Sequence, residues 1–157
     1  MRIAIESPDQ PEVIALIARL DAYQTRLYPP ASNHLVDLAA LLRPEVLFAV
    51  ARDATGQACG CGALRLFDGF GEVKRMYVGT ERRGLGIGAA LLALLESRAM
   101  AQGCFLFRLE TGIYQPEALA LYRRAGFVRR GPFADYPDDP LSVFMEMRVA
   151  RTDGPPR

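Results

Sequence analysis

The stretch Arg83-Gly84-Leu85-Gly86-Ile87-Gly88 separates an extended segment from a helical one. Residues 72–78 before it are rich in β-branched, aromatic and apolar side chains, whereas 89–100 after it carry leucines at helical spacing. Glycines at such a corner let backbone N–H groups approach a ligand with no side chain in the way. A helix N-terminus adds unpaired donors and the positive end of a dipole, and Arg82 adds fixed charge beside Arg83. The sequence therefore predicts an anion site, suited to a phosphate or pyrophosphate.

The composition is that of an ordinary globular chain. Of 157 residues, 50% are apolar and 24% charged, so we expect one domain over 1–150 and a flexible C-terminal tail at 151–157. The net charge of +1 gives no reason to expect nucleic acid or an anionic membrane as a partner. No apolar run approaches the roughly 18 residues that span a bilayer. With three cysteines and no secretory signal, we expect a cytoplasmic location.

Metal and hydrolase chemistry are not expected. A single glycine separates Cys59 from Cys61, but no second pair of metal ligands accompanies them, and His34 is the only histidine. A Ser-His-Asp or Cys-His hydrolase would have to use His34, which stands in a proline-rich connection without a nucleophile-elbow motif. We therefore predict no metal site and no hydrolytic triad.

Hydrophobic periodicity predicts a mixed α/β fold. The expected strands are, in chain order, 2–6, 46–52, 61–67, 72–78, 104–110 and 142–149. The expected helices begin near Pro8 or Pro11 and end before Pro29, run from Ser32 or Asn33 to Leu42, and later cover 89–100 and 116–125. This order predicts a single, mostly antiparallel central sheet flanked by helices.

One interpretation of the glycine corner is a dinucleotide site. Gly84-x-Gly86-x-x-Ala89 matches the dinucleotide-binding fingerprint, and Glu110 stands about where a ribose-binding acid belongs. Five residues, 79–83, separate the strand from the first glycine, whereas the fingerprint needs a glycine close behind its strand. The chain offers one convincing strand–helix–strand unit, and no Gly-Lys-Ser/Thr of a P-loop NTPase. A dinucleotide-dependent oxidoreductase is a distant alternative.

The second interpretation uses Arg83-x-x-Gly86-x-Gly88. With Val78 ending the strand, this pattern resembles the acyl-CoA loop of the GCN5-related N-acetyltransferases, the GNAT family. Residues 118–127, Ala-Leu-Ala-Leu-Tyr-Arg-Arg-Ala-Gly-Phe, resemble that family's second signature, an A-x-x-L-Y helix that runs into a Gly-Phe turn. The two signatures stand at the family's spacing, and the order of elements is similar to the family fold. The resemblance is specific over about residues 72–128 and architectural outside them.

The resemblance implies acetyl-CoA as co-substrate, without a metal. In the family, the strand that corresponds to Met76, Tyr77 and Val78 splays from the next strand, and the pantetheine arm pairs with its backbone in the gap. The residues that would wrap the pyrophosphate are Arg83, Gly84, Leu85, Gly86, Ile87, Gly88 and Ala89. Arg82 would meet solvent or an outer phosphate. Gln115 stands where the family often has a cofactor-contacting Asn, so a contact from this longer side chain is left open.

The resemblance also implies roles in acetyl transfer to a primary amine of a small molecule, an amino acid or a peptide. Only a neutral amine attacks a thioester, so a base or a water chain must take a proton. Glu72 is the preferred base; Glu110 is a second candidate, otherwise substrate-binding or structural. Tyr122 is the expected acid for the departing thiolate, and an N–H near Val78 the expected oxyanion donor. Cys104 lacks a basic partner, so direct transfer in a ternary complex is expected.

The acceptor pocket is expected between the connections 27–34 and 133–140, with Tyr28 and Tyr136 as candidate substrate-binding residues. The acidic second connection suits a cationic amine or is simply a solvated turn. His34 is expected at the surface or at a helix cap. Two questions stay open at this point: whether the chain is instead a regulatory acyl-CoA-binding module that transfers nothing, and whether it forms a homodimer.

Overall fold

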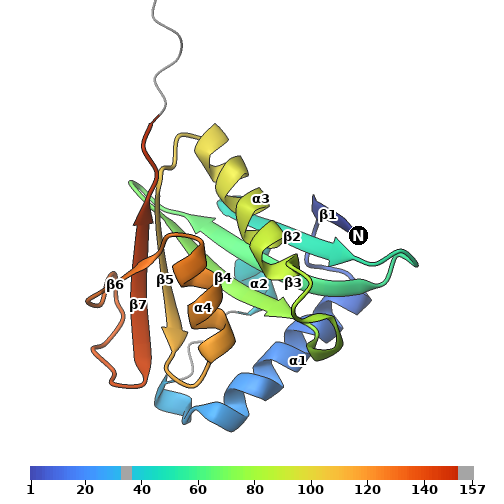
Figure 1. Cartoon of the computed structure of the whole chain (residues 1–157), viewed down its shortest axis with the longest axis horizontal. Helices are drawn as coiled ribbons and strands as arrows, with labels where there is room; N and C mark the ends of the chain where they lie inside the picture. Colours follow the sequence, from blue (N-terminus) through green and yellow to red (C-terminus); the bar gives the residue numbers. More distant parts are fainter. Residues whose placement is uncertain (33–36, 152–157) are drawn as a thin grey trace, which may run out of the picture.

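A computed structural model describes residues 1–32 and 37–151. Seven strands form one sheet in the order β1-β2-β3-β4-β5-β7-β6 (Figure 1). The strands are β1 (Arg2–Ile5), β2 (Val46–Arg52), β3 (Ala58–Leu66), β4 (Gly71–Val78), β5 (Leu106–Gly112), β6 (Val128–Arg130) and β7 (Ser142–Arg148). Neighbouring strands are antiparallel except β4 and β5, which run parallel. The predicted mixed, mostly antiparallel sheet is confirmed.

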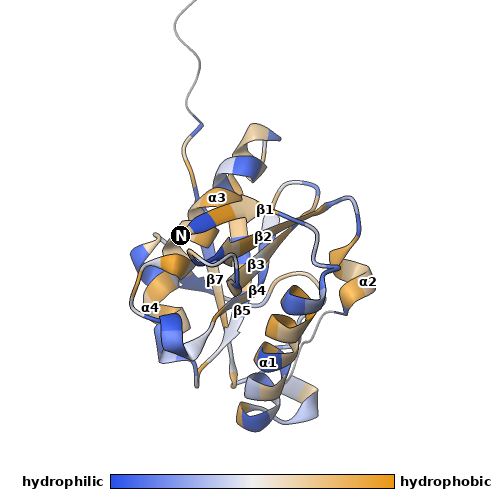
Figure 2. Ribbon diagram, turned by 90° about the vertical axis from the view of Figure 1, so that its right-hand side faces the viewer, coloured by the Kyte–Doolittle hydropathy of each residue, from blue (hydrophilic) through white to orange (hydrophobic). Residues whose placement is uncertain are grey.

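Helices cover both faces of this sheet (Figure 2). On one face lie α1 (Pro11–Leu27) and α2 (Leu38–Leu41), and on the other α3 (Ile87–Ala101) and α4 (Pro116–Arg124). Two short 3-10 helices, η1 (Pro30–Ser32) and η2 (Thr80–Arg82), follow α1 and β4. Each face has its own buried apolar cluster, one beneath α3 and α4 and one beneath α1. The molecule is therefore a three-layer α/β structure with the sheet in the middle.

Local sequence explains the two longest helices. In α1, Val13, Leu16 and Leu20 recur at helical spacing and are buried against the sheet, and Pro11 occupies the first turn, where no N–H is needed. The helix ends at an extended Tyr28, before two prolines. In α3, the buried positions Ile87, Leu91, Leu92, Leu95 and Ala99 form the inner face.

β4 and β5 diverge after a short paired stretch. Their pairing runs from Gly71, opposite Phe107, to Val73, opposite Leu109. Beyond Val73 no further pairing joins the two strands in the described part of the chain, so residues 74–78 present an open strand edge. The expected splay of these two strands is confirmed.

A bulge lies in β4 within the splayed part. The register between β3 and β4 shifts near Gly62, so this single residue faces both Arg75 and Met76. Arg75 has a φ of 57°, in the left-handed region that residues with a Cβ rarely adopt.

Backbone direction in β4 follows from one hydrogen bond just beyond the bulge. The N–H of Gly79 donates to the carbonyl oxygen of Cys59, next to β3, at 2.9 Å. Because alternate residues of a strand point their backbone groups to the same neighbour, Val78 and Met76 point theirs the opposite way. The N–H and C=O groups of Met76 and Val78 are therefore directed into the gap between β4 and β5.

Several predicted element boundaries were wrong. The second helix is only α2, because Asp37 caps it: the Asp37 Oδ1 accepts the N–H of Ala40 at 2.8 Å. Ser32 lies in η1 instead, and Asn33 and His34 lie outside the described residues. The fifth predicted strand starts at Leu106 rather than at 104 and runs on to Gly112. It follows that Glu110 lies within a strand rather than at its end.

Other differences concern the rest of the sheet and the chain ends. β3 begins at Ala58 and not at 61, and β6 was not predicted, because three mostly exposed residues carry no readable alternation. Of the predicted tail at 151–157, only Arg151 is described. None of the helices in the described ranges combines the length and the apolarity that crossing a membrane requires.

Candidate active site

The segment after β4 forms an open cradle of backbone donors. Gly84 and Gly86 have φ values of +80° and +79°, and a Cβ added to either would point into open space. Within the described ranges, the N–H groups from Gly86 to Ala89 have no hydrogen-bond partner, and the N–H of Ala90 is the first that bonds back into α3. Four free donors at the positive end of a 15-residue helix suit the phosphates of a bound nucleotide.

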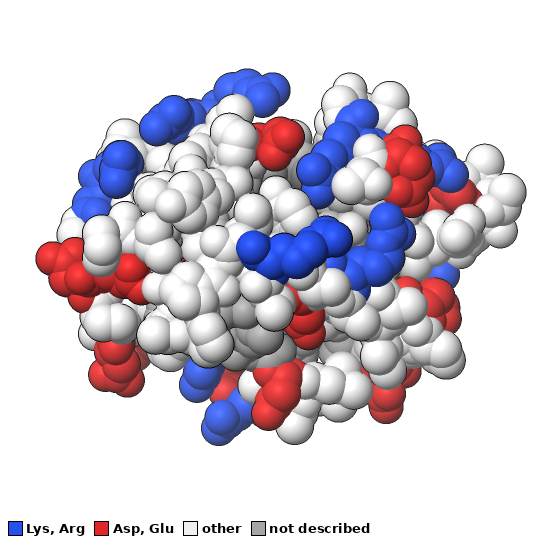
Figure 3. Space-filling view, turned by 90° about the horizontal axis from the view of Figure 1, so that it is seen from below, with Lys and Arg blue, Asp and Glu red and all other residues white. Residues whose placement is uncertain are grey.

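The two arginines before this loop differ in their partners. Arg82 was expected to meet solvent or a phosphate, but it pairs with Asp53 at 2.6 Å and so ties the loop to the β2–β3 hairpin. Arg83 is exposed, makes no ion pair within the described ranges, and donates a long hydrogen bond of 3.4 Å to the oxygen of Val78. Figure 3 shows a cluster of basic side chains near the middle of the face seen from below, with acidic side chains around it. Arg83 lies over the Tyr23 ring at 5.7 Å and has no acidic partner among the described residues, so its charge is available to an anion at the loop.

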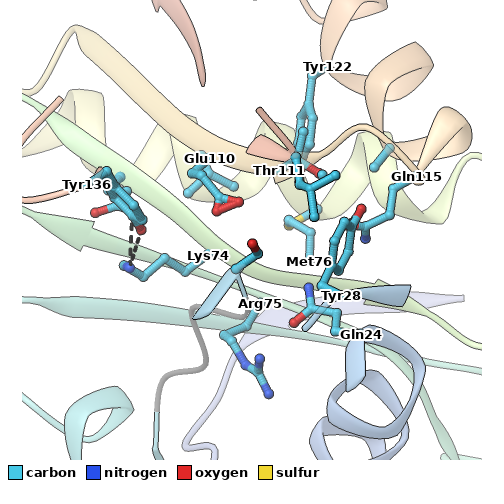
Figure 4. Close-up of a pocket in the computed structure, with 16 residues that line it drawn as sticks. Gln24, Tyr28, Lys74, Arg75, Met76, Glu110, Thr111, Gln115, Tyr122 and Tyr136 are labelled. Carbon is cyan, nitrogen blue, oxygen red and sulfur yellow. Dashed lines mark hydrogen bonds and ion pairs between the residues drawn. The ribbon is translucent and has the colours of Figure 1, made fainter. Parts of the chain in front are cut away.

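A pocket opens where β4 and β5 part (Figure 4). It draws residues from both strands, from α1, η1 and α4, and from the connection before β7. Seven predicted site residues line it: Tyr28, Glu72, Met76, Glu110, Gln115, Tyr122 and Tyr136. Tyr77 does not, because its side chain is buried in the cluster beneath α1. The connections 27–34 and 133–140 both reach the pocket, through Tyr28, Ser32 and Tyr136, and Ser32 Oγ donates to Asp139 between them.

Glu72 is enclosed by its neighbours. Only 3% of it is exposed, and its Oε2 accepts the Tyr136 hydroxyl at 2.5 Å. Lys74 Nζ lies 3.1 Å from the same oxygen and donates to the Tyr136 oxygen at 3.0 Å. These three side chains form a closed, charge-balanced cluster at one end of the pocket. Lys74 pairs with Glu72, whereas the neighbouring Arg75 pairs with Asp21.

Glu110, unlike Glu72, lacks such partners in the described chain. Its carboxyl group is half-buried in the pocket and makes no hydrogen bond or ion pair with any described residue. Burial raises its pKa to about 8; the nearby charge of Lys74 partly opposes this, and Glu72 and Asp139 add to it. The group therefore exchanges a proton near neutral pH, as a general base must.

Tyr122 approaches from α4. It is 6% exposed, packs edge-on against Phe127 with ring centroids 5.8 Å apart, and reaches toward Thr111 and Met76 (Figure 4). Burial, reinforced by Glu110, raises the pKa of its hydroxyl far above the ordinary value, so the hydroxyl stays protonated. It has no hydrogen-bond partner among the described residues. The hydroxyl is available as a proton donor to a ligand.

Tyr28 and Gln115 form the other wall. The Tyr28 hydroxyl donates to Gln115 Oε1 at 3.2 Å and accepts the N–H of Tyr114 at 3.2 Å. A Cβ at Gly112 would lie 1.6 Å from that hydroxyl oxygen, so only glycine fits there. Burial raises the pKa of Tyr28 to about 12. Tyr28 is therefore a fixed wall that leaves the amide nitrogen of Gln115 without a partner in the described ranges.

Among the polar side chains that line the pocket, sequence reasoning did not single out Gln24, Lys74, Arg75 and Thr111 as site residues. Lys74 had a signal, since it is two residues from Glu72 and alternate strand residues share a face. Gln24 had none, because only the packing of α1 on β4 brings it to the site. Nowhere in the described chain do three or more His, Cys, Asp or Glu side chains gather in a way that could hold a metal ion.

The sequence model of the Acetyltransferase (GNAT) family matches residues 13–127. The chain belongs to the GNAT family of acetyltransferases. It is 51% identical to IAA acetyltransferase of Azospirillum brasilense over 146 residues, 92% of this chain and 95% of that one. An uncharacterised N-acetyltransferase of Bacillus subtilis (strain 168), YsnE, is 33% identical over 153 residues, covering 95% and 100% of the two chains. A structure from Klebsiella pneumoniae assigned as an acyl-CoA N-acyltransferase superposes with a TM-score of 0.84 at 45% identity, covering 95% and 97%.

This GNAT enzyme is accordingly an acyl-CoA-dependent acetyltransferase with acetyl-CoA as co-substrate, as its sequence resemblance implied. The described residues fit that co-substrate: the loop offers free N–H groups and an unpaired arginine, and the open edge of β4 offers backbone pairs beside the pocket. The comparisons give no support to an acyl-CoA sensor or to a dinucleotide-dependent oxidoreductase.

Proposed function

We propose that this acetyltransferase moves the acetyl group of acetyl-CoA directly to a primary amine held in the pocket between β4 and β5. One observation carries the proposal: the pocket contains a half-buried carboxyl group, that of Glu110, with no partner among the described residues and a pKa of about 8. An ammonium group is the natural partner for such a carboxylate. The same carboxylate then takes the proton that the amine must lose before it can attack a thioester.

Glu110 is a better general base than Glu72, which the sequence favoured. The Glu72 carboxylate already accepts Tyr136 and pairs with Lys74, so protonating it would break both contacts. Its 3% exposure also leaves little room for a substrate. We therefore assign the base to Glu110 and give Glu72 the task of holding Tyr136 and Lys74 in the pocket wall.

Tyr122 is the proposed acid. Glu110 first takes one proton from the ammonium group, and the neutral amine nitrogen then bonds to the thioester carbon. As the C–S bond breaks, the sulfur takes the proton of the Tyr122 hydroxyl, the second proton leaves the nitrogen and restores that hydroxyl, and Glu110 releases its proton to solvent. The raised pKa of that hydroxyl keeps it protonated until the thiolate leaves. An N–H of β4 near Val78 is the proposed oxyanion donor, which the inferred direction of the β4 backbone supports.

The proposed acetyl-CoA contacts follow the two open backbone surfaces. Met76 and Val78 would pair with the pantetheine arm through their main-chain atoms, while Tyr77 between them packs the opposite face. Residues 83–89 would hold the pyrophosphate. Gln115 keeps its amide N–H groups for the ligand because Tyr28 takes its oxygen.

The pocket's charges favour a cationic acceptor. Lys74 is neutralised by Glu72, and Arg75 pairs with Asp21, so among the described lining residues the charge left unpaired is that of ionised Glu110. Tyr28 and Tyr136 are the proposed walls for the body of the acceptor. The relative from Azospirillum brasilense is named for IAA, which belongs in any acceptor screen of this chain. We also propose that the protein is cytoplasmic.

An acceptor screen tests the proposal. Release of CoA thiol from acetyl-CoA is measured with primary amines, amino acids, polyamines, peptides and IAA, and acetylated products are identified by mass spectrometry. We expect turnover with at least one primary amine, slowed by about a hundredfold in Glu110→Gln. Tight acetyl-CoA binding without turnover across the panel would instead favour a sensor, and turnover with IAA but no amine would overturn the amine acceptor.

A further inference from the structure

We infer that Arg75 is a positioning residue for acetyl transfer. Its ion pair with Asp21 of α1 holds the bulge of β4 in the one conformation that aims the backbone of Met76 and Val78 into the gap. The inference rests on the proposed function, because it concerns how well that reaction is aligned. Arg75 contributes to the pocket lining, but its side chain points away from Glu110 and Tyr122 (Figure 4).

The conformation of Arg75 needs external support. A φ of 57° places its Cβ against its own backbone, and an arginine left to itself would return to an extended conformation. A regular strand at this point would remove the bulge and move every following residue of β4 by one position relative to β3.

The side chains of β4 show what the bulge achieves. Val73 is buried in the cluster beneath α3 and α4, and Met76, three residues later, packs against the same cluster. In an unbulged strand, residues three apart lie on opposite faces. The extra residue at Arg75 therefore returns Met76 to the α3 side and turns Tyr77 toward α1. Without it, the backbone groups facing the gap would be those of Tyr77.

Three contacts hold this arrangement. The guanidinium of Arg75 pairs with Asp21, and only 3% of the Arg75 side chain is exposed. The thiol of Cys61 donates to the Arg75 carbonyl oxygen at 3.6 Å, and burial raises the pKa of that thiol to about 12, so it keeps its proton. Opposite the bulge, Gly62 leaves space for Met76, whose sulfur would lie 2.3 Å from a Cβ there.

The ion pair also joins the two sides of the reaction pocket. Asp21 lies on α1, one to two turns before Gln24 and Tyr28, which line the acceptor side. Arg75 lies on β4, next to the edge that faces the acetyl-CoA gap. Loss of the pair therefore lets the acceptor wall and the cofactor strand move independently. A misplacement of about 1 Å between reacting groups costs on the order of a hundredfold in rate.

The test uses Asp21→Asn, which removes the charge, and Arg75→Gly, which removes the side chain but accepts the left-handed conformation. We expect each variant to lower kcat about tenfold or more. The Kd for CoA should change by a smaller factor than kcat, because the loop at 83–89 still holds the pyrophosphate and only the pantetheine contacts of Met76 and Val78 are affected. Asp21→Glu should recover most of the rate. Arg19→Gln is the matched control, since Arg19 makes an exposed ion pair from the same helix, with Glu81.

The double variant separates positioning from simple stability. If Arg75 and Asp21 act as one unit, the Arg75→Gly, Asp21→Asn protein should be no slower than the slower single variant. A kcat within twofold of wild type for Asp21→Asn, measured well below its unfolding temperature, would overturn the inference and leave the proposed function standing. If wild type acetylates no amine while acetyl-CoA binds, the proposed function itself fails, and this inference with it.

Discussion

At the scale of single residues, two carboxylates on adjacent strands differ because their partners differ. Glu72 pairs with Lys74 and accepts the Tyr136 hydroxyl, whereas Glu110 faces the pocket with no partner among the described residues. We therefore propose that the first carboxylate has a structural role and the second a chemical one. This division depends on Tyr136, which reaches the site from a connection more than 60 residues away from Glu72.

The Glu110→Gln variant tests the base through the pH profile. The wild-type kcat/KM should rise with pH and level off above about 8, because the base acts only when ionised. The variant should be slower by about a hundredfold. The kcat/KM of the variant should also show no step near pH 8. It should rise only as the free amine loses its own proton. Glu72→Gln is the comparison: a profile that loses the step in Glu72→Gln but not in Glu110→Gln would return the base to Glu72.

Stability should change with pH in the same variant. Below pH 4.5 the Glu110 carboxyl is protonated in both folded and unfolded chains and has no effect. From pH 4.5 to about 8 the unfolded chain releases this proton while the folded chain keeps it, so stability falls as pH rises. Glu110→Gln should therefore unfold at a higher temperature than wild type at pH 8.5, by about 2–4 °C for each kcal/mol recovered. Equal unfolding temperatures of wild type and Glu110→Gln at pH 8.5 would show that burial does not raise the pKa of the Glu110 carboxyl.

The Tyr122→Phe variant tests the acid. We expect kcat to fall roughly ten- to a hundredfold, because the proton donor is gone. The unfolding temperature should hardly move, since the ring keeps its packing against Phe127. Tyr114→Phe is the control. A phenylalanine ring can still stack on Tyr28, and the Tyr28 hydroxyl is held by the backbone N–H of residue 114, which the substitution keeps. An unchanged kcat in Tyr122→Phe would remove the acid role.

At the scale of elements, the corner between β4 and α3 follows directly from its glycines. Gly84 and Gly86 take left-handed conformations, and α3 begins immediately afterwards, as the sequence predicted. The bulge at Arg75 could not be predicted, because an arginine inside a β-rich run gives no sign of a positive φ. β6 was missed for a related reason: it exists only because β7 pairs with it.

Gly86→Ala, paired with Gly56→Ala, tests the loop. Both glycines have φ near +80°, and a Cβ at either meets nothing within 4 Å. Each substitution should therefore cost a similar amount, about 1–2 kcal/mol, in the free energy of unfolding. Only Gly86→Ala should weaken CoA binding, by tenfold or more, when both are titrated calorimetrically. Equal CoA affinities for the two variants would place the pyrophosphate elsewhere.

At the scale of the whole molecule, the seven strands that the structure describes form one sheet in which only β4 and β5 separate along their length. Pairing between β4 and β5 stops at Val73, and beyond it α1, α4 and the connection before β7 close around the gap. Sequence patterns predicted the sheet class, the family and seven of the residues that line the pocket. They ranked Glu72 above Glu110 as the base, because the burial and pairing on which our opposite assignment rests arise only when distant segments meet.

The central claim is direct acetyl transfer from acetyl-CoA to an amine in that gap. The measurement is mass spectrometry of enzyme and products after a single turnover, with and without an amine found in the acceptor screen. We predict no acetyl group on the enzyme without acceptor and, with it, one acetylated amine for each CoA released. An acetyl group on the enzyme before the amine is added, or CoA released without an acetylated amine, would contradict it.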